Sequence, residues 1–237
     1  MKKFAYASGI GICAGFLASM VVFFKGLDTL EVLSYFVFWV GLGFMVAYTH
    51  IRMGWWLRGL ILAEIFAIPV FLMTLKSFGG ESLAYMTANI VLINGFIGIT
   101  MGYFNGLASD EVNEIVVFSQ DYAKKLKISA AAGFLTSLIV LVPMSFYGQS
   151  SAAKISAVLH WTVLSLIISS VNINLKGWLV GFIVVELTMI PMAIVYIRQD
   201  PLALWPMLII AGAIGAFLGM FNYRYAKAVI VGSVKSV

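Results

Sequence analysis

The sequence predicts an all-α polytopic membrane protein with eight transmembrane helices, built as two parallel four-helix repeats related by pseudo-two-fold symmetry. Three observations support this. Apolar runs of about twenty residues, long enough to cross a bilayer, recur along the whole chain. The second half of the chain also repeats motifs of the first half in the same order. Of the 237 residues, 62% are hydrophobic and only 11% are charged, whereas a soluble domain carries about 25% charged residues.

The clearest repeated motif is an apolar segment that contains one glutamate and, five positions later, a proline. A shift of 122 residues makes seven of the fourteen positions from Trp56 to Pro69 identical to those from Trp178 to Pro191. The identical pairs include Trp56 with Trp178, Gly59 with Gly181, Glu64 with Glu186 and Pro69 with Pro191. An acidic residue in an apolar run is costly, so its repetition indicates duplication of a whole unit.

The other spans repeat as well, so each span of one half has a counterpart in the other. Residues 14–19 match 132–137 at a shift of 118, Trp39 matches Trp161 at 122, and residues 93–105 match 210–222 at 117. The expected spans are 4–24, 30–49, 55–75, 86–104, 128–147, 155–171, 177–197 and 203–221. We therefore expect a first repeat over residues 1–105, a cytoplasmic linker over 106–127, and a second repeat with a short cytoplasmic tail over 128–237.

Loop charges predict the orientation. With the N-terminus inside, eleven basic residues fall on the cytoplasmic side and four on the outer side, which is a positive-inside bias. The inner set is Lys2, Lys3, Arg52, Arg58, Lys124, Lys125, Lys127, Lys176, Arg224, Lys227 and Lys235, and the outer set is Lys25, Lys76, Lys154 and Arg198. The expected location is the cytoplasmic (inner) membrane, with both termini cytoplasmic. Because each half has an even number of spans, both halves enter from the same side and the repeats are parallel.

Glu64 and Glu186 are the main candidate functional residues. Each lies eight residues after a tryptophan expected at the membrane interface, which places it roughly 12 Å into the apolar slab. An acidic side chain there costs about 2.5–3.5 kcal/mol on insertion scales, so it must be protonated, paired or in contact with water. The functional interpretation is a proton- or cation-binding pair near the middle of the membrane.

The same motif also has a structural interpretation, in which it bends the helix. Pro69 and Pro191 each remove an amide donor and free the carbonyl four residues earlier, which bends a helix. A protonated glutamate next to the freed carbonyl could donate to the backbone near the bend. Duplication does not separate the two interpretations, because an ancestral bend would also be copied.

His160 is the histidine expected near mid-membrane, and its repeat counterpart is Phe38. One interpretation is a histidine hydrogen-bonded within the helix bundle, and the other is a proton relay with Glu186. His50 lies at the end of the second span. Two histidines at these depths lack the neighbouring ligands that a haem or metal site requires, so we expect no metal and no cofactor.

Glycines and tryptophans are expected to have structural roles. Gly98 with Gly102, and Gly215 with Gly219, are small residues four apart, a spacing that lets helices approach closely in lipid. Trp56 and Trp178 are typical of the aromatic belts at membrane interfaces.

The function predicted from these features is a small membrane transporter or channel, coupled to protons or cations through Glu64 and Glu186. The alternative is a non-catalytic membrane subunit or scaffold that binds partner helices through its glycine faces. An intramembrane enzyme acting on lipid or quinone is a third hypothesis, which the lack of a polar cluster and of known catalytic motifs disfavours. The expected partners are the lipid bilayer and a small solute or cation of unknown identity, not nucleic acid. A homo-oligomer or a partner membrane subunit remains open.

Overall fold

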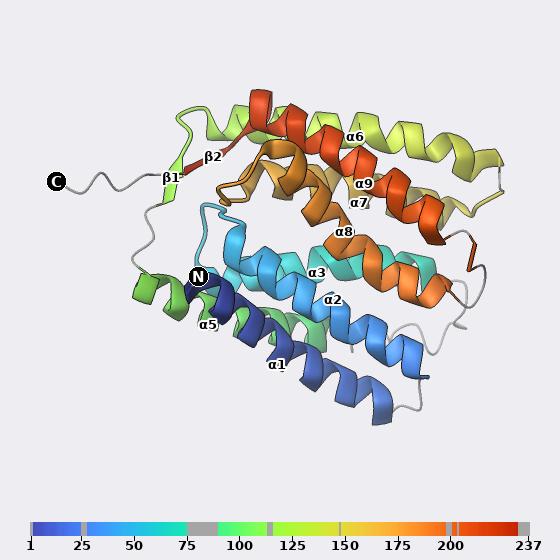
Figure 1. Cartoon of the computed structure of the whole chain (residues 1–237), viewed down its shortest axis with the longest axis horizontal. Coiled ribbons are helices and arrows are strands. Elements are labelled where there is room, and N and C mark those ends of the chain that lie inside the picture. The colour runs from blue at the N-terminus through green and yellow to red at the C-terminus, as the bar shows by residue number, and fades with distance from the viewer. Residues whose placement is uncertain are drawn as a thin grey trace.

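The computed structural model describes residues 2–24, 28–74, 90–112, 116–146, 148–197, 201–202 and 204–231. Its long helices lie side by side in a bundle (Figure 1). They are α1 (Lys2–Phe24), α2 (Thr29–Tyr48), α3 (Trp55–Thr74), α5 (Gly95–Val112), α6 (Tyr122–Phe146), α7 (Ser151–Ser170), α8 (Gly177–Tyr196) and α9 (Leu204–Phe221). Two short π-helical segments, η1 (Ile90–Asn94) and η2 (Asn222–Ala226), adjoin α5 and α9.

Local sequence signals account for several helix ends. Asp28 and Glu31 form a capping box at the start of α2, in which Asp28 Oδ1 accepts from the Leu30 and Glu31 amides and Glu31 Oε2 accepts from the Asp28 amide. Ser150 caps α7 by accepting from the Ala153 amide at 3.2 Å. The turn between α6 and α7 contains Gly148 at φ 64°, a conformation that favours glycine.

A two-stranded antiparallel sheet lies at the end of the bundle where α1 and α6 begin (Figure 1). Strand β1 (Val116–Phe118) pairs with β2 (Val229–Val231), with Val117 opposite Ile230. The sheet was not predicted from the sequence. It places the start of α1 and the last described strand at the same end of the bundle.

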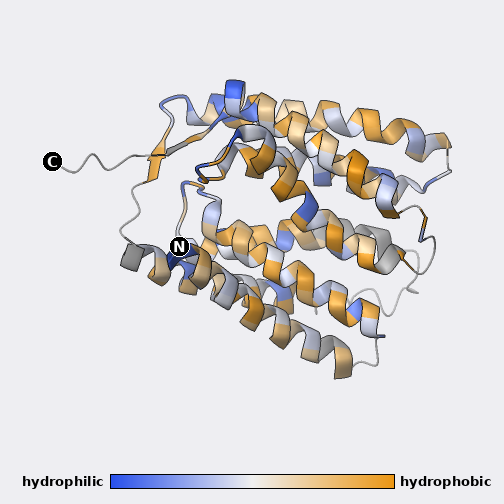
Figure 2. Cartoon of the chain, viewed as in Figure 1, coloured by the Kyte–Doolittle hydropathy of each residue, from blue (hydrophilic) through white to orange (hydrophobic). Residues whose placement is uncertain are grey.

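The helices have the length and composition of membrane spans. Within the described residues, seven helices are long and apolar enough to cross a bilayer: α1, α2, α5, α6, α7, α8 and α9 with η2. Figure 2 shows hydrophobic colour over most of the helices and a hydrophilic concentration near the start of α6. Large apolar side chains on the outer helices are exposed, among them Phe16 on α1 and Ile139 on α6. This is consistent with a multi-pass membrane protein.

The observed helices agree with the expected spans to within a few residues at most ends, and α3 is helical where the third span was expected although it is not one of the seven. The linker differs: α5 continues to Val112 and α6 begins at Tyr122, so helix covers much of 106–127. The start of the fourth span at 86–89, and the charges on Lys25, Lys76, Arg198 and Lys235, lie outside the described residues.

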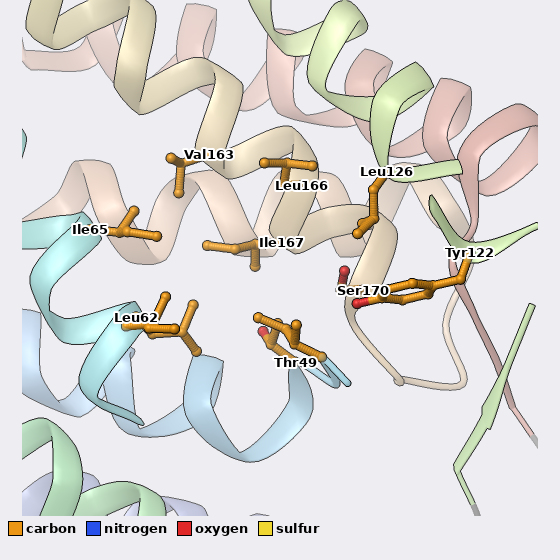
Figure 3. A pocket seen from close by; sticks show the side chains of 11 residues that line it. Thr49, Leu62, Ile65, Tyr122, Leu126, Val163, Leu166, Ile167 and Ser170 are labelled. Carbon is orange, nitrogen blue, oxygen red and sulfur yellow. The ribbon is translucent and has the colours of Figure 1, made fainter. Parts of the chain in front are cut away.

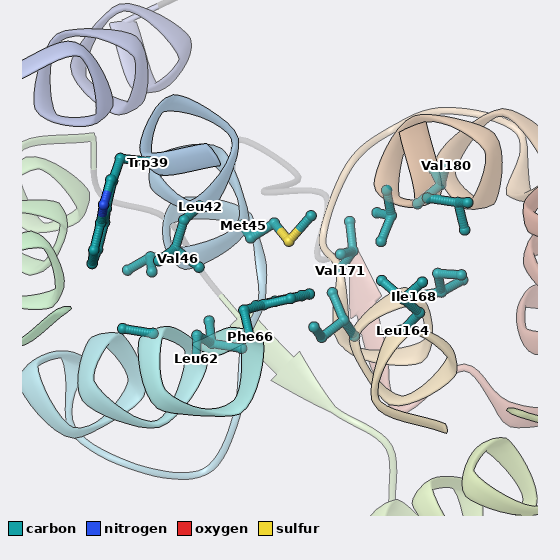
Figure 4. Close-up of a cluster of buried hydrophobic side chains, with 14 of the residues drawn as sticks. Trp39, Leu42, Met45, Val46, Leu62, Phe66, Leu164, Ile168, Val171 and Val180 are labelled. Carbon is teal, nitrogen blue, oxygen red and sulfur yellow. The ribbon is translucent and has the colours of Figure 1, made fainter. Parts of the chain in front are cut away.

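The core lies between the first four helices and the last four. α2 packs on α8, and α3 packs on α7, while α1 pairs with α2, α3 with α5, α6 with α7 and α8 with α9. Figure 4 shows Leu42, Met45 and Phe66 on one side of this core and Leu164 and Ile168 on the other. These contacts fix the central helices that carry the candidate residues.

Candidate functional site

Glu64 and Glu186 occupy corresponding positions, each against a glycine of the following helix. A Cβ at Gly95 of α5 would lie 3.0 Å from Glu64 Oε1, and a Cβ at Gly212 of α9 would lie 2.7 Å from Glu186 Oε1. Gly95 and Gly212 match each other in the sequence at the shift of 117. The two carboxyl groups therefore lie in two separate helix pairs, α3 with α5 and α8 with α9.

Both carboxyl groups have a buried oxygen that is not satisfied. Oε1 of Glu64 and Oε1 of Glu186 are buried and have no hydrogen-bond partner among the described residues, although both side chains are partly exposed. A buried oxygen without a partner is costly, and such groups are often functional. The bend interpretation needs a glutamate that donates to a backbone carbonyl, and the described residues offer no such partner to Oε1 of either glutamate.

The backbone beside Glu64 is irregular. The π-helical segment η1 packs against α3 and leads directly into Gly95, the residue that Glu64 faces. Single π-helical turns widen a helix and occur frequently at functional sites. In the second motif, Ser34 Oγ of α2 donates to the carbonyl of Pro191 at 2.7 Å. Helix α2 therefore provides a hydrogen-bond donor to the backbone of α8 at its proline. Pro69 lies within α3 as Pro191 does within α8.

His160 lies on α7, and its ring meets an aromatic ring of α3. Its ring centroid is 6.5 Å from that of Phe66, two residues after Glu64, and 6.2 Å from that of Trp161. Its Nε2 is buried without a hydrogen-bond partner in the described part of the chain. The structure thus brings His160 to the helix that carries Glu64.

The expected glycines lie at very close helix contacts inside the chain. A Cβ on Gly98 would lie 2.6 Å from the Gly59 carbonyl oxygen, and one on Gly215 would lie 2.7 Å from the Gly181 carbonyl oxygen. Gly102 lies in the same way against the Trp55 carbonyl. Gly219 lies in the same way against the Gly177 carbonyl. These glycines allow α3 to contact α5, and α8 to contact α9, backbone to backbone.

Trp56 and Trp178 lie in the first turns of α3 and α8, and 52% and 45% of their surfaces are exposed. Large amphipathic rings exposed at helix ends are typical of a membrane interface.

Sequence reasoning missed a group of basic side chains buried at the end of the bundle where the chain begins. His50 is 1% exposed and Arg58 is 5% exposed. Lys3 Nζ lies 3.4 Å from His50 Nε2, and Arg58 Nη1 lies 3.4 Å from His50 Nδ1. Burial, with the charges of Lys3, Arg58 and Lys227, lowers the pKa of His50 to about 2. The imidazole is therefore neutral, and it has one nitrogen that can accept from one of the two cations at a time.

Aromatic and carbonyl groups hold two of these cations. Arg58 lies 4.0 Å above the Trp55 ring. Lys227 lies 3.9 Å above the Tyr223 ring and donates to the Val171 carbonyl. Burial lowers the pKa of Lys227 from 10.5 to about 7. The sequence signal for this group is Arg58, which lies three residues into an apolar span rather than in a loop.

A cavity of about 170 Å³ lies between α3 and α7 and is closed at one side by the start of α6 (Figure 3). Neither glutamate nor His160 lines it. Within the described residues, no group of three His, Cys, Asp or Glu side chains could hold a metal ion. No protein family, curated protein or solved structure matches this chain.

Proposed function

We propose that the protein is a small membrane transporter or channel that moves a small solute or cation, with Glu64 and Glu186 as exchangeable proton- or cation-binding groups. The main support for the proposal is that Oε1 of each glutamate is buried without a hydrogen-bond partner among the described residues. Each faces the matching glycine of the following helix. An ionisable group within a transmembrane helix marks an ion or substrate pathway by default. His160, with its own buried nitrogen beside Phe66, is an accessory group on the Glu64 side.

The proposal includes two parallel repeats, residues 1–105 and 128–237, related by a two-fold axis. An isolated antiparallel bridge pairs Thr49 with Val171, which correspond at the shift of 122. The hydrogen bonds around it are reciprocal: the His50 amide donates to the Ser170 carbonyl at 2.9 Å, and the Asn172 amide donates to the Tyr48 carbonyl at 2.8 Å. The same shift relates His50 to Asn172 and Tyr48 to Ser170. This reciprocity is what an axis through the bridge would produce.

Helix contacts support the same axis. Under the repeat correspondence, α2 matches α7 and α3 matches α8, so the α2–α8 contact is the counterpart of the α7–α3 contact. In the first half, α1 meets α2 where a Cβ on Gly43 would lie 2.6 Å from Gly11 Cα. At the matching place between α6 and α7, Ser129 Oγ donates to the Ser165 carbonyl and Ser165 Oγ donates to the Ser129 carbonyl, both at 2.7 Å. These matching contacts support the proposed repeats.

The chemistry follows from the unsatisfied carboxyl oxygens. A carboxylate without a donor in an apolar bundle is much less stable than a neutral carboxylic acid, whereas a cation or water beside it stabilises the ionised form. Arrival of a cation would therefore release a proton, and departure would recapture it. Two such groups at equal depth would couple proton movement to cation movement in opposite directions.

The test uses purified protein in proteoliposomes that contain a pH-sensitive dye, with Na⁺ or K⁺ gradients as the driving probes. Wild-type protein is expected to change the internal pH when a cation gradient is imposed. Glu64→Gln and Glu186→Gln preserve size and remove titration, so both should leave folded protein and abolish this change. His160→Ala should reduce it less. Glutamine variants that match wild type from about pH 5 to pH 8 would refute the proposal.

A scaffold subunit is the second candidate, because the cavity described above contains neither glutamate and each carboxyl lies in its own helix pair. This candidate predicts that wild-type vesicles show no cation-driven pH change and that both glutamine variants retain wild-type stability and partners. Its glycine faces would have to lie elsewhere, since Gly98, Gly102, Gly215 and Gly219 are already covered within the chain.

A further inference from the structure

The wall of the cavity between α3 and α7 contains residues that differ between the two halves of the chain. On the opposite side of the bundle, α2 meets α8 at Gly41, where a Cβ would lie 3.1 Å from the Leu187 carbonyl oxygen. At the shift of 122, Gly41 corresponds to Val163 and Leu187 to Ile65, and both Val163 and Ile65 line the cavity. A valine in place of a glycine holds α3 and α7 apart where their counterparts touch.

A second difference enlarges the space. Ser170 lines the cavity at the position that corresponds to Tyr48. In the other half, Tyr48 fills its position with a ring that Lys3 Nζ approaches to 4.7 Å from the centroid. A serine side chain is much smaller than the tyrosine ring of its counterpart. Two residues that line the cavity, Val163 and Ser170, therefore differ from their counterparts Gly41 and Tyr48 in the other half.

The wall is aliphatic, but polar atoms lie at one end. Ile61, Leu62, Ile65, Leu126, Leu166 and Ile167 form most of the lining. Thr49 and Tyr122 are the residues with hydroxyl groups at this end, and Figure 3 shows the Tyr122 oxygen directed towards Ser170. Thr49 is 0% exposed, and both its Oγ1 and Tyr122 Oη are buried without hydrogen-bond partners among the described residues. Two buried hydroxyl groups at the end of an apolar cavity are suited to a ligand that is mostly hydrocarbon and has one oxygen acceptor.

A cation lies beside these hydroxyl groups. Arg52 is exposed, follows the lining residue Ile51, and places its guanidinium 4.7 Å from the Tyr122 ring centroid. It also donates to the Ser119 carbonyl at 3.4 Å, which keeps it on this side of α6. The order along the site is thus aliphatic wall, hydroxyl donors, then positive charge. A glycerophospholipid has the complementary order of acyl chain, ester carbonyl and phosphate.

We propose that this cavity binds the segment of one acyl chain next to the ester group of an anionic phospholipid, with the ester carbonyl accepting from Tyr122 Oη or Thr49 Oγ1 and the phosphate beside Arg52. A dry aliphatic cavity of about 150 Å³ accommodates a benzene-sized group, so about six carbons fit here. The cavity lies where α2 and α7 end, which is the depth at which ester groups occur in a bilayer if these helices span it. The site is separate from Glu64 and Glu186, so it does not depend on the transport proposal.

The experiment is photolabelling of the purified full-length protein in vesicles that contain phosphatidylglycerol with a diazirine on the acyl chain, followed by peptide mapping. Labels are expected to concentrate on α3, α7 and the start of α6 at the cavity residues. Ser170→Tyr restores the residue of the other half and fills the space, so it should remove this labelling. Ile155→Tyr is the matched control, because Ile155 is on the same helix and 55% exposed, and it should leave cavity labelling unchanged.

Milder variants keep the test valid if Ser170→Tyr does not fold. Tyr122→Phe and Thr49→Val keep the volume and remove the hydroxyl groups, and together they should reduce cavity labelling. Arg52→Gln should remove the preference for diazirine phosphatidylglycerol over diazirine phosphatidylcholine, a preference of about fivefold for one basic side chain at a membrane surface.

Three results would overturn the proposal. They are labelling spread evenly over exposed helix faces, labelling that folded Ser170→Tyr leaves unchanged, and cavity labelling by a diazirine fatty acid but by neither phospholipid.

Discussion

Adding one methyl group at Gly181 should measurably destabilise the protein. A Cβ at this position would overlap the Gly215 carbonyl oxygen and lie 2.7 Å from both Cα and N of Gly219. All three are backbone atoms, so no side-chain rotation can relieve the overlap and α8 must separate from α9. Overpacking of this kind costs about 1–3 kcal/mol. For a chain of 150–250 residues this corresponds to about 2–4 °C per kcal/mol, or a decrease of about 2–12 °C in Tm for Gly181→Ala.

The assay is thermal unfolding of detergent-purified protein, followed by tryptophan fluorescence and by the fraction that remains monodisperse after heating. Gly9→Ala is the matched control, because Gly9 also lies in a helix. Unlike Gly181 it is exposed, and nothing lies within 4 Å of where its Cβ would be. It should have wild-type stability or slightly more, since alanine favours helix over glycine. Gly59→Ala should behave like Gly181→Ala, because its Cβ would overlap the Gly98 carbonyl oxygen. Equal Tm values for Gly181→Ala and Gly9→Ala would refute the backbone-contact reasoning.

Two further predictions concern charge and orientation. Burial lowers the pKa of Lys227 to about 7, while an unfolded lysine keeps its proton to about pH 10.4, so the unfolded state binds more protons between these values. The Tm should therefore rise from pH 7 towards pH 10, and Lys227→Met should flatten that rise. An unchanged slope in the variant would assign the rise to other groups. Reporter fusions at the N-terminus and at the C-terminus should both report the cytoplasmic side, and a split result would contradict both the charge bias and the parallel repeats.

Much of the helical fold could be predicted because it depends on local sequence. Apolar length placed most helix ends to within a few residues, and Asp28 with Glu31 marks the start of α2 in the sequence itself. The β1–β2 sheet was missed because two three-residue strands over 100 positions apart have no local periodicity that joins them. The positive charges were predicted to lie in loops, but Arg58 folds back over Trp55 and is buried.

The candidate site was predictable in its residues but not in its geometry. Repetition of the motif identified Glu64 and Glu186, yet only the packed helices show that each faces a glycine of its own helix pair. The cavity was missed, although two of its lining residues, Val163 and Ser170, differ in the sequence from their counterparts Gly41 and Tyr48. Repetition identifies what the halves share, whereas these two lining residues are among those that differ.

The central claim is that the carboxyl groups of Glu64 and Glu186, each with one buried oxygen, carry exchangeable protons. Infrared difference spectroscopy of the protein in lipid vesicles tests it directly through the C=O stretch of neutral carboxylic acids. We predict such a band at about pH 5 that weakens as the pH rises towards pH 8 or when Na⁺ or K⁺ is added. Each single Glu→Gln variant should lose part of the band, and Glu64→Gln with Glu186→Gln should lose all of it. A band that neither pH nor cations change, or one that persists in the double variant, would contradict the claim.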